Sequence, residues 1–179
     1  MRIAVAYDSV YGNTKIVAEA IAQQAVQDGC SSDLLNLRKD KFRDLEGDVL
    51  FVGGPTHMGG MTHRVRRFLK RVDREYWGRR TLVAFDTYGP VGSDPESRRK
   101  AQRWIEPGAV GGIITLAQEL GLPIRTDNLR CLVAELRGPL VPDALSFAKK
   151  FTHELLAGNE AMGGVPLLGP HEAVVGAEP

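Results

Sequence analysis

The sequence has few of the features that would assign it to a specialised class of protein. Only two of its 179 residues are cysteines, Cys30 and Cys131, and they are far apart and in no metal-binding spacing. A disulfide framework and a zinc site are therefore not expected. No apolar run approaches the roughly 20 residues of a membrane-spanning helix, and the N-terminus shows no charged region followed by a long apolar segment. These absences predict a protein of the cytoplasm that does not enter a membrane.

The chain also has almost no net charge, but its charges are unevenly distributed. Residues 1–60 carry six lysines and arginines against eight acidic residues, whereas residues 61–80 carry eight against only Asp73 and Glu75. The basic segment 61–80 would attract acidic partners or anionic substrates. Alternatively, its arginines pair with the acidic residues of the first sixty. Nucleic-acid binding is not expected, because no aromatic platform for base stacking accompanies the charge.

The most informative stretch is RIAVAYDSVYGNTKIV, at residues 2–17. It begins with apolar, branched residues typical of a buried strand, and a helical pattern of apolar residues starts at Ile16. A loop at the N-terminus of a helix exposes unpaired backbone N–H groups and the positive end of the helix dipole, so this one predicts an anion site. The alternative is that Asn13 or Thr14 only caps the helix. The residues between strand and helix are small or hydroxylated: Ser9, Val10, Tyr11, Gly12, Asn13 and Thr14.

This loop resembles the phosphate loop of the flavodoxin family, whose pattern is Ser/Thr-x-Thr-Gly-Asn-Thr. Tyr11 stands in a position often held by threonine. In that family the loop holds the terminal phosphate of flavin mononucleotide (FMN), so the resemblance implies FMN as the cofactor. Neither a Walker phosphate loop nor the GxGxxG fingerprint occurs, which argues against ATP, GTP and a tightly held nicotinamide dinucleotide.

Strand-like and helical patterns alternate along the chain. Such alternation predicts an α/β fold in which helices cover both faces of a parallel sheet. Five strands fit the flavodoxin-like three-layer sandwich with strand order 2-1-3-4-5, in which the loops after strands 1, 3 and 4 meet at one edge. We expect strands at residues 3–6, 33–37, 48–53, 81–86 and 129–136, helices at 14–27, 61–80, 108–120 and 142–156, and polar connections at 38–46 and 91–107 that each have room for one short helix.

The loop after the third expected strand contains Pro55, Thr56, His57, Met58, Gly59 and Gly60. It resembles the family loop that lies along the flavin ring, although it could also be a plain Gly/Pro turn. Because glycine allows a peptide to flip at low cost, we expect the carbonyl of Met58 or Gly59 to turn toward the flavin nitrogen that is protonated on one-electron reduction.

The loop after the fourth expected strand contains Thr87, Tyr88 and Gly89. The resemblance implies that Tyr88 stacks on the flavin; otherwise Tyr88 is an aromatic side chain that covers a turn. Classical members often have a tryptophan in the other flanking loop, where this chain has His57 and Met58. One flavin face is therefore expected to be open or covered by another subunit. His57 could donate a hydrogen bond to the flavin or to a reduced quinone, or be only an exposed loop histidine.

The resemblance implies electron transfer through FMN between protein partners, with an acidic redox partner docking near residues 61–80. An alternative is a flavoenzyme similar to the NAD(P)H:quinone oxidoreductases, which use quinone and NAD(P)H and complete their sites in homo-oligomers. Residues 54–61 partly match the Gly-Thr-Pro-Thr-Arg-Phe-Gly-Asn-Met loop of those enzymes, without its Arg and Phe, and residues 91–107 match their insertion near the fourth strand. A non-redox interaction module with the same fold is a further alternative.

We expect residues 1–157 to form the FMN-binding domain, and residues 158–179, dominated by Gly, Pro and Ala, to form a C-terminal tail. The tail is either loose or packed as an arm on this subunit or another. Trp77 and Trp104 lie outside the three loops and are assigned to packing. No Ser-His-Asp arrangement, paired-carboxylate motif or metal triad is visible, so we expect no catalytic residue and no metal site.

Overall fold

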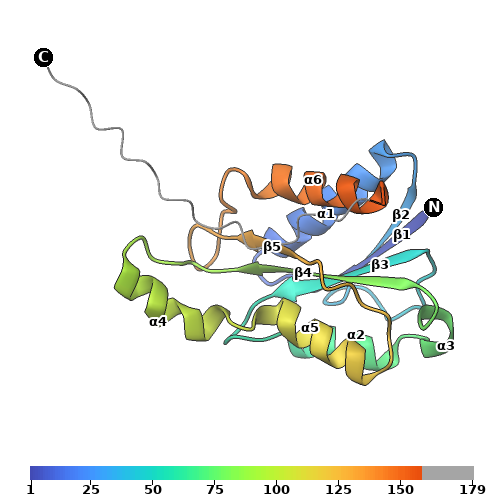
Figure 1. The fold of residues 1–179 in the computed structure, drawn as a ribbon, viewed down its shortest axis with the longest axis horizontal. Coiled ribbons are helices and arrows are strands. Elements are labelled where there is room, and N and C mark those ends of the chain that lie inside the picture. The colour runs from blue at the N-terminus through green and yellow to red at the C-terminus, as the bar shows by residue number, and fades with distance from the viewer. Residues whose placement is uncertain (159–179) are drawn as a thin grey trace, which may run out of the picture.

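The computed structural model describes residues 1–158, which form a three-layer α/β sandwich (Figure 1). Five parallel strands make one sheet in the order β2-β1-β3-β4-β5, which confirms the predicted fold. They are β1 (Arg2–Tyr7), β2 (Ser31–Asn36), β3 (Val49–Pro55), β4 (Thr81–Tyr88) and β5 (Leu129–Leu132).

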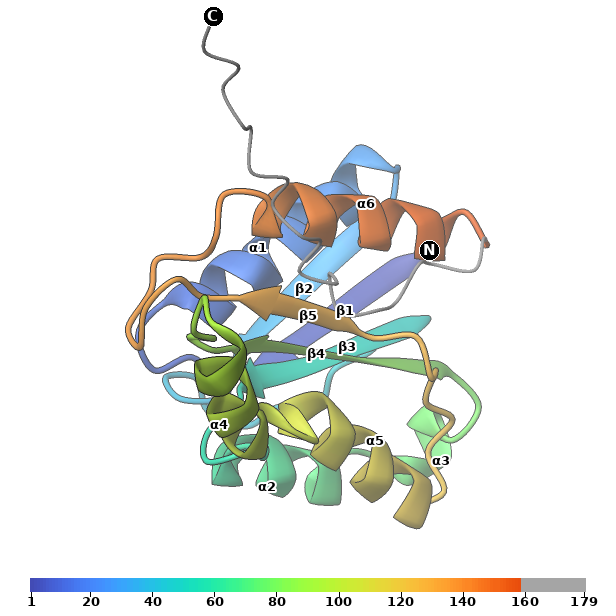
Figure 2. The same ribbon diagram turned by 60° about the vertical axis from the view of Figure 1, so that its left-hand side comes forward.

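Helices cover both faces of this sheet. The pair α1 and α6 packs on one face, and α2 and α5 pack on the other (Figure 2). Within residues 1–158 the helices are α1 (Asn13–Gln27), α2 (His63–Arg71), α3 (Arg74–Trp77), α4 (Pro95–Ile105), α5 (Gly108–Glu119) and α6 (Ala144–Leu156).

The core consists of two apolar layers, one on each face of the sheet. Because side chains alternate along a strand, Phe51 of β3 faces α1 and α6, whereas Leu50 and Val52 face α2 and α5. Both faces are buried, which explains why the central strands are apolar without interruption. The polar residues are therefore left to the loops at the strand ends, where the candidate site lies.

The expected helix over residues 61–80 is wrong in its length, because two helices occupy this segment. Helix α2 stops at Val72, and the Asp73 carboxylate accepts hydrogen bonds from the backbone N–H groups of Glu75 and Tyr76, at 2.9 and 3.0 Å. An aspartate in this position starts a new helix. No helix forms in the connection 38–46.

The connection 91–107 contains a longer helix than expected, α4. The Asp94 carboxylate accepts a hydrogen bond from Ser97 N at 2.9 Å, and Pro95 occupies the first turn, so the helix has a strong start. None of its residues is buried, because α4 extends past the carboxyl ends of the strands instead of covering the sheet (Figure 1). The assignment of Trp104 to packing is therefore wrong: 49% of its surface is exposed, against 1% for Trp77.

No helix among residues 1–158 is long and apolar enough to cross a bilayer. The predicted C-terminal tail lies outside the described residues, apart from Gly158. The domain boundary at residue 157 and the cytoplasmic location stay predictions.

Candidate functional site

A cavity of about 270 Å³ opens at the carboxyl edge of the sheet, between the loops that follow β1, β3 and β4. In a doubly wound sheet this edge is where ligands bind. The cavity is lined by Val10, Tyr11, Asn13, Thr14, Pro55, Thr56, His57, Thr87, Tyr88, Gly89, Val133 and Leu136.

All but two of the lining residues are site residues expected from the sequence. The exceptions, Val133 and Leu136, follow β5, whose end lies at the same edge. The sequence pattern predicts a last strand that extends to residue 136, which is too long because β5 ends at Leu132, so this segment is a loop that the pattern does not identify. Other expected residues belong to the three loops but do not line the cavity: Ser9, Gly12, Met58, Gly59 and Gly60.

The loop after β1 is arranged around the hydroxyl of Ser9. Its Oγ accepts hydrogen bonds from the backbone N–H groups of Gly12 and Lys15, both at 3.2 Å. Gly12 is the N-cap of α1 and has φ +98°, a left-handed conformation that favours glycine. The alternative that Asn13 or Thr14 caps the helix is therefore wrong.

The first turn of α1 keeps free hydrogen-bond donors. The backbone N–H groups of Asn13 and Thr14 donate to no acceptor within residues 1–158, and the turn contains no acidic residue. Free amides and the helix dipole together favour an anion at this place.

Side chains of the first loop also hold the neighbouring loops in place. The hydroxyl oxygens of Thr14 and Thr87 lie 2.8 Å apart, and this pair is buried. Asn13 Nδ2 donates to the backbone oxygen of Arg137 at 3.1 Å, and the Arg137 guanidinium lies 5.5 Å from the centroid of the Tyr11 ring. Arg137, which the sequence reasoning missed, thus brings a positive charge to the anion loop.

Residues 57–60 form a tight turn with both cross-turn hydrogen bonds. His57 N donates to Gly60 O at 2.9 Å, and Gly60 N donates to His57 O at 3.1 Å. The central residues Met58 and Gly59 have φ values of +50° and +78°, as in a type I′ turn. The Gly59 carbonyl accepts a hydrogen bond from Gly108 N at 3.1 Å, whereas the Met58 carbonyl has no donor within residues 1–158. Of the two carbonyls expected to move, that of Met58 is therefore the freer.

A buried polar network lies behind the loop after β3. Thr56 Oγ1 donates to Asp86 Oδ2 at 2.7 Å and accepts from Ala109 N at 2.8 Å. Arg130 Nε donates to Asp86 Oδ1 at 3.1 Å, and the two other guanidinium nitrogens reach Glu106 Oε1 at 3.1 Å and the oxygen of Ile105 at 2.8 Å. Asp86 is fully buried and Arg130 is 5% exposed, so these bonds replace water.

The network also adjoins Tyr88. The Arg130 guanidinium lies 4.5 Å from the centroid of the Tyr88 ring, within cation–π range. Burial raises the pKa of the Tyr88 phenol, so the side chain stays neutral near pH 7. Burial likewise raises the pKa of Asp86, against the opposing charge and hydrogen bonds of Arg130.

The sequence reasoning missed Asp86 and Arg130, although a signal was present. Each is a charged residue within an otherwise apolar strand, and the two strands are neighbours in which these positions lie opposite each other. A charged residue within a buried strand predicts an oppositely charged neighbour, because buried charges are rarely left without a partner.

The walls and the mouth of the cavity differ in exposure. Tyr88 is only 5% exposed, so little of its ring is free in the absence of a conformational change. Tyr11 and Leu136 line the same cavity and are exposed, as is Met58 in the turn beside it. Stacking of Tyr88 on a flavin stays a prediction, and Tyr11 and Leu136 are further candidates for contact with the ring.

A family model described as a flavodoxin domain matches residues 4–154. The chain belongs to the flavodoxin family. Membership of this family implies a flavodoxin-like electron-carrier domain and FMN binding.

Individual flavodoxins and a diflavin protein are similar to this chain. It is 33% identical over 100 residues to the flavodoxin of Aquifex aeolicus (strain VF5), which covers 53% of this chain and 54% of that protein. It is 29% identical over 140 residues to the "putative diflavin flavoprotein A 2" of Thermosynechococcus vestitus, covering 74% and 23%. The chain thus spans about half of one of these proteins and under a quarter of the other. A solved flavodoxin from the Archaea shares the fold with a TM-score of 0.64 at 21% identity, over 88% of this chain and 98% of that one.

The donor set of the cavity fits the phosphate of FMN. The free amides of Asn13 and Thr14 lie at the N-terminus of α1, and no residue that lines the cavity is acidic. A dianionic group would therefore meet dipoles and hydrogen-bond donors without a repelling charge.

Proposed function

We propose that the chain binds FMN in the cavity at the carboxyl edge of the sheet and transfers electrons between protein partners. The observation that carries the proposal is the pair of free backbone amides at the start of α1, which border a cavity without a carboxylate. When bound, FMN supplies the electron-transfer chemistry, and the protein supplies binding, orientation and electrostatics.

The residues take two sets of roles in this proposal. Residues 9–14 bind the phosphate: the amides of Asn13 and Thr14 donate to it, and Arg137 adds a nearby positive charge. Residues 55–57 and 87–89 line the cavity and would border the ring, with the turn at residues 57–60 beside it and Tyr88 as part of the wall. The Met58 carbonyl has no hydrogen-bond donor within residues 1–158, so it would be available to accept a hydrogen bond from a protonated flavin nitrogen.

The partner in this proposal is an acidic redox protein that docks near residues 61–80. This segment is the most basic part of the chain, and it starts directly after the turn at residues 57–60. Opposite charges on two partners accelerate their encounter and orient it.

A second candidate is quinone reduction with NAD(P)H, and the exposure of α4 favours it. A helix with no buried residue beside the cavity is suited to cover a substrate or to meet a second subunit. His57 lines the cavity and is exposed, so it could donate a hydrogen bond to a reduced quinone.

An anaerobic potentiometric titration of the FMN-loaded protein tests the proposal. A one-electron carrier should show two separated midpoint potentials, one for each electron. A single two-electron step, followed by rapid reoxidation by quinone, would favour the second candidate. Failure to bind FMN at all would contradict both and leave a non-redox module with this fold.

A further inference from the structure

The cations of residues 61–80 have no acidic partner in the part of the chain that the structure describes, residues 1–158. None of the eight lysines and arginines in this segment forms an ion pair within residues 1–158. The alternative that they pair with acidic residues of the first sixty is therefore wrong. Several of those acidic residues instead pair with other cations, for example Asp33 with Arg43 and Asp8 with Arg38.

Three of these cations border a groove beside α2. The groove has a volume of about 360 Å³ and lies between α2 and the chain that leaves β2. Helix α2 contributes His63, Arg64, Arg67, Phe68 and Arg71, and the opposite wall consists of Leu35, Leu37, Asp40 and Phe42.

The groove combines an aromatic surface with positive charge. Phe42, which is 36% exposed, packs against Phe68 with ring centroids 6.2 Å apart. The Arg71 guanidinium lies over the Phe42 ring at 4.1 Å from its centroid. Asp40, the one acidic residue in the lining, accepts a hydrogen bond from Asn36 N at 2.8 Å and so helps to hold the turn after β2. The groove therefore suits an anion that also has an apolar group.

The spacing of the arginines indicates the length of the anionic ligand that would fit the groove. Arg64, Arg67 and Arg71 are three and four residues apart and so lie along one side of α2, over on the order of 10 Å at the helical rise per residue. An extended peptide covers this length with about three residues. Arg67 and Arg71 are about 6 Å apart along the helix axis. One carboxylate on each side of a single apolar residue in an extended peptide would match this spacing, since such carboxylates are about 7 Å apart.

We propose that the groove is the docking site for an acidic segment of a partner protein, in which carboxylates flank an apolar side chain. The carboxylates pair with Arg67 and Arg71 of α2, and the apolar side chain lies on the exposed ring of Phe42 in the opposite wall. The inference deepens the proposed function and rests on it only in taking the partner to be a redox protein. Strand β2 ends at the same sheet edge as β1, β3 and β4, and helix α2 begins near that edge with His63 and Arg64.

The test measures the binding of a fluorescent acidic peptide, acetyl-Asp-Glu-Phe-Glu-Asp, by anisotropy. The double variant R67E/R71E reverses two charges in the groove, and R66E/K70E is the matched control. Arg66 and Lys70 are exposed on the same helix with the same spacing, but they do not line the groove. We expect R67E/R71E to weaken binding by more than about tenfold, equal to about 1.4 kcal/mol, and the control by much less.

Three results would overturn the proposal. They are equal losses in the two double variants, absence of peptide binding by the wild type, and tighter binding of a single-stranded oligonucleotide of the same charge. Replacing the Phe of the peptide by Ser should also weaken binding, because the aromatic surface would lose its contact. FMN affinity is measured separately for each variant. Peptide binding without FMN binding would contradict the proposed function and leave the groove assignment standing, whereas the reverse result would contradict only the groove.

Discussion

Asp86 of β4 and Arg130 of β5 lie opposite each other in the sheet, and both are buried. The pair itself need not stabilise the fold, because desolvation of both charges offsets their attraction. It does bring together Thr56, the junction between α4 and α5, and the ring of Tyr88. The ion pair therefore holds the loops around the cavity in place.

Replacing both partners of this pair should cost less stability than the two single replacements added together. Arg130→Met leaves the buried Asp86 without its counter-charge, at a cost of about 3–5 kcal/mol in the free energy of unfolding. The double variant R130M/D86N should lose clearly less than the sum of its two single variants. Urea-induced unfolding measures this, and additive losses would contradict the account. Arg125→Met is the control: its partner Asp127 is partly exposed, so we expect a loss within about 1 kcal/mol.

The two cysteines should differ in reactivity. Burial raises the pKa of Cys131 to about 12, whereas Cys30 is only partly buried. Because the thiolate is the reactive form, a thiol reagent at pH 8 should modify Cys30 alone in the folded protein and both cysteines in denaturant. Mass spectrometry of the labelled peptides identifies the site, and rapid labelling of Cys131 under native conditions would contradict the burial.

At the scale of single residues, the sequence predicted those site residues that stand out from their neighbours by residue type. The small and hydroxylated residues at 9–14 and the glycines near Met58 could be identified because an anion-binding loop and a tight turn each require these residue types within a short stretch of sequence. Arg130 had a local signal, a charge within an apolar strand, but its partner Asp86 is distant in sequence. Arg137 contacts Asn13, also distant in sequence, and no local pattern identified it.

Among the elements, the turn at residues 57–60 stores a small conformational cost. Met58 has φ +50°, a conformation that is unfavourable for a residue with a Cβ. A flip of the peptide between Met58 and Gly59 would convert the type I′ turn to type II′, and a type II′ turn favours glycine at the position of Met58. Gly59 cannot serve as the test site, because a Cβ there would lie 3.1 Å from the oxygens of Arg103 and Glu106.

Met58→Gly should therefore make the flip easier. In the FMN-loaded protein we expect the midpoint potential of the first electron to rise by tens of mV, since about 59 mV corresponds to a tenfold change for one electron. Met58→Ala shortens the side chain but keeps the Cβ, so its potential should stay near that of the wild type. Equal shifts in the two variants would show that the side chain, not the backbone, controls the potential.

The two tryptophans differ in burial, because Trp77 of α3 points into the core and Trp104 lies on the exposed helix α4. Trp77 in α3 is 1% exposed, and Trp77→Ala should cost about 3–5 kcal/mol of unfolding free energy. Trp104 in α4 is 49% exposed, and Trp104→Ala should cost within about 0.5 kcal/mol. A large loss in the Trp104 variant, measured by urea unfolding, would contradict the exposed position of α4.

Sequence periodicity predicted the elements well where a helix or strand faces the core. The alternation of strands and helices follows from burial on both faces of the sheet, which constrains every residue. Periodicity did not predict the helix boundary at Asp73, because the apolar pattern continues past this residue while its carboxylate caps a new helix. It also did not predict the length of α4, because a helix without buried residues shows no periodic pattern of apolar residues.

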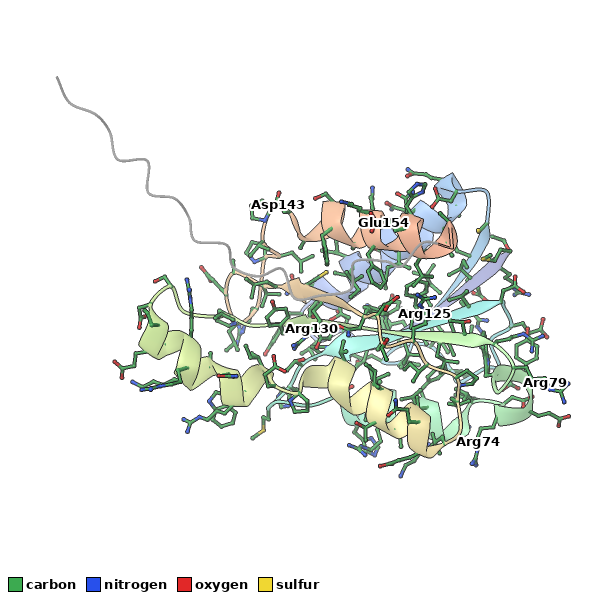
Figure 3. All side chains as sticks on the ribbon, in the orientation of Figure 1. Arg74, Arg79, Arg125, Arg130, Asp143 and Glu154 are labelled. Carbon is green, nitrogen blue, oxygen red and sulfur yellow. The ribbon has the colours of Figure 1, made fainter. Side chains whose placement is uncertain are left out.

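For the whole molecule, the near-zero net charge results from separate regions of opposite character. Residues 1–60 are slightly acidic and their charges are partly paired, whereas the α2 surface is basic and has no ion pairs within residues 1–158. Added salt should therefore weaken association with an acidic partner, because screening acts on exposed unpaired charges. Arg74 and Arg79 extend the basic surface toward the end of the molecule that holds α3, opposite α4 (Figure 3).

The whole account depends on the anion site at the start of α1, so the most direct measurement compares flavins with and without the phosphate. FMN and riboflavin are each titrated into the purified protein and into Asn13→Asp and Asn13→Ala, with quenching of flavin fluorescence as the readout. Both variants lose the hydrogen bond to the Arg137 carbonyl, and only Asn13→Asp adds a negative charge beside the phosphate.

We predict that the wild type binds FMN far more tightly than riboflavin. Asn13→Asp should weaken FMN binding by more than tenfold relative to Asn13→Ala and leave riboflavin binding unchanged. Equal affinity of the wild type for the two flavins, or equal FMN affinity of the two variants, would contradict the assignment of the phosphate to this loop.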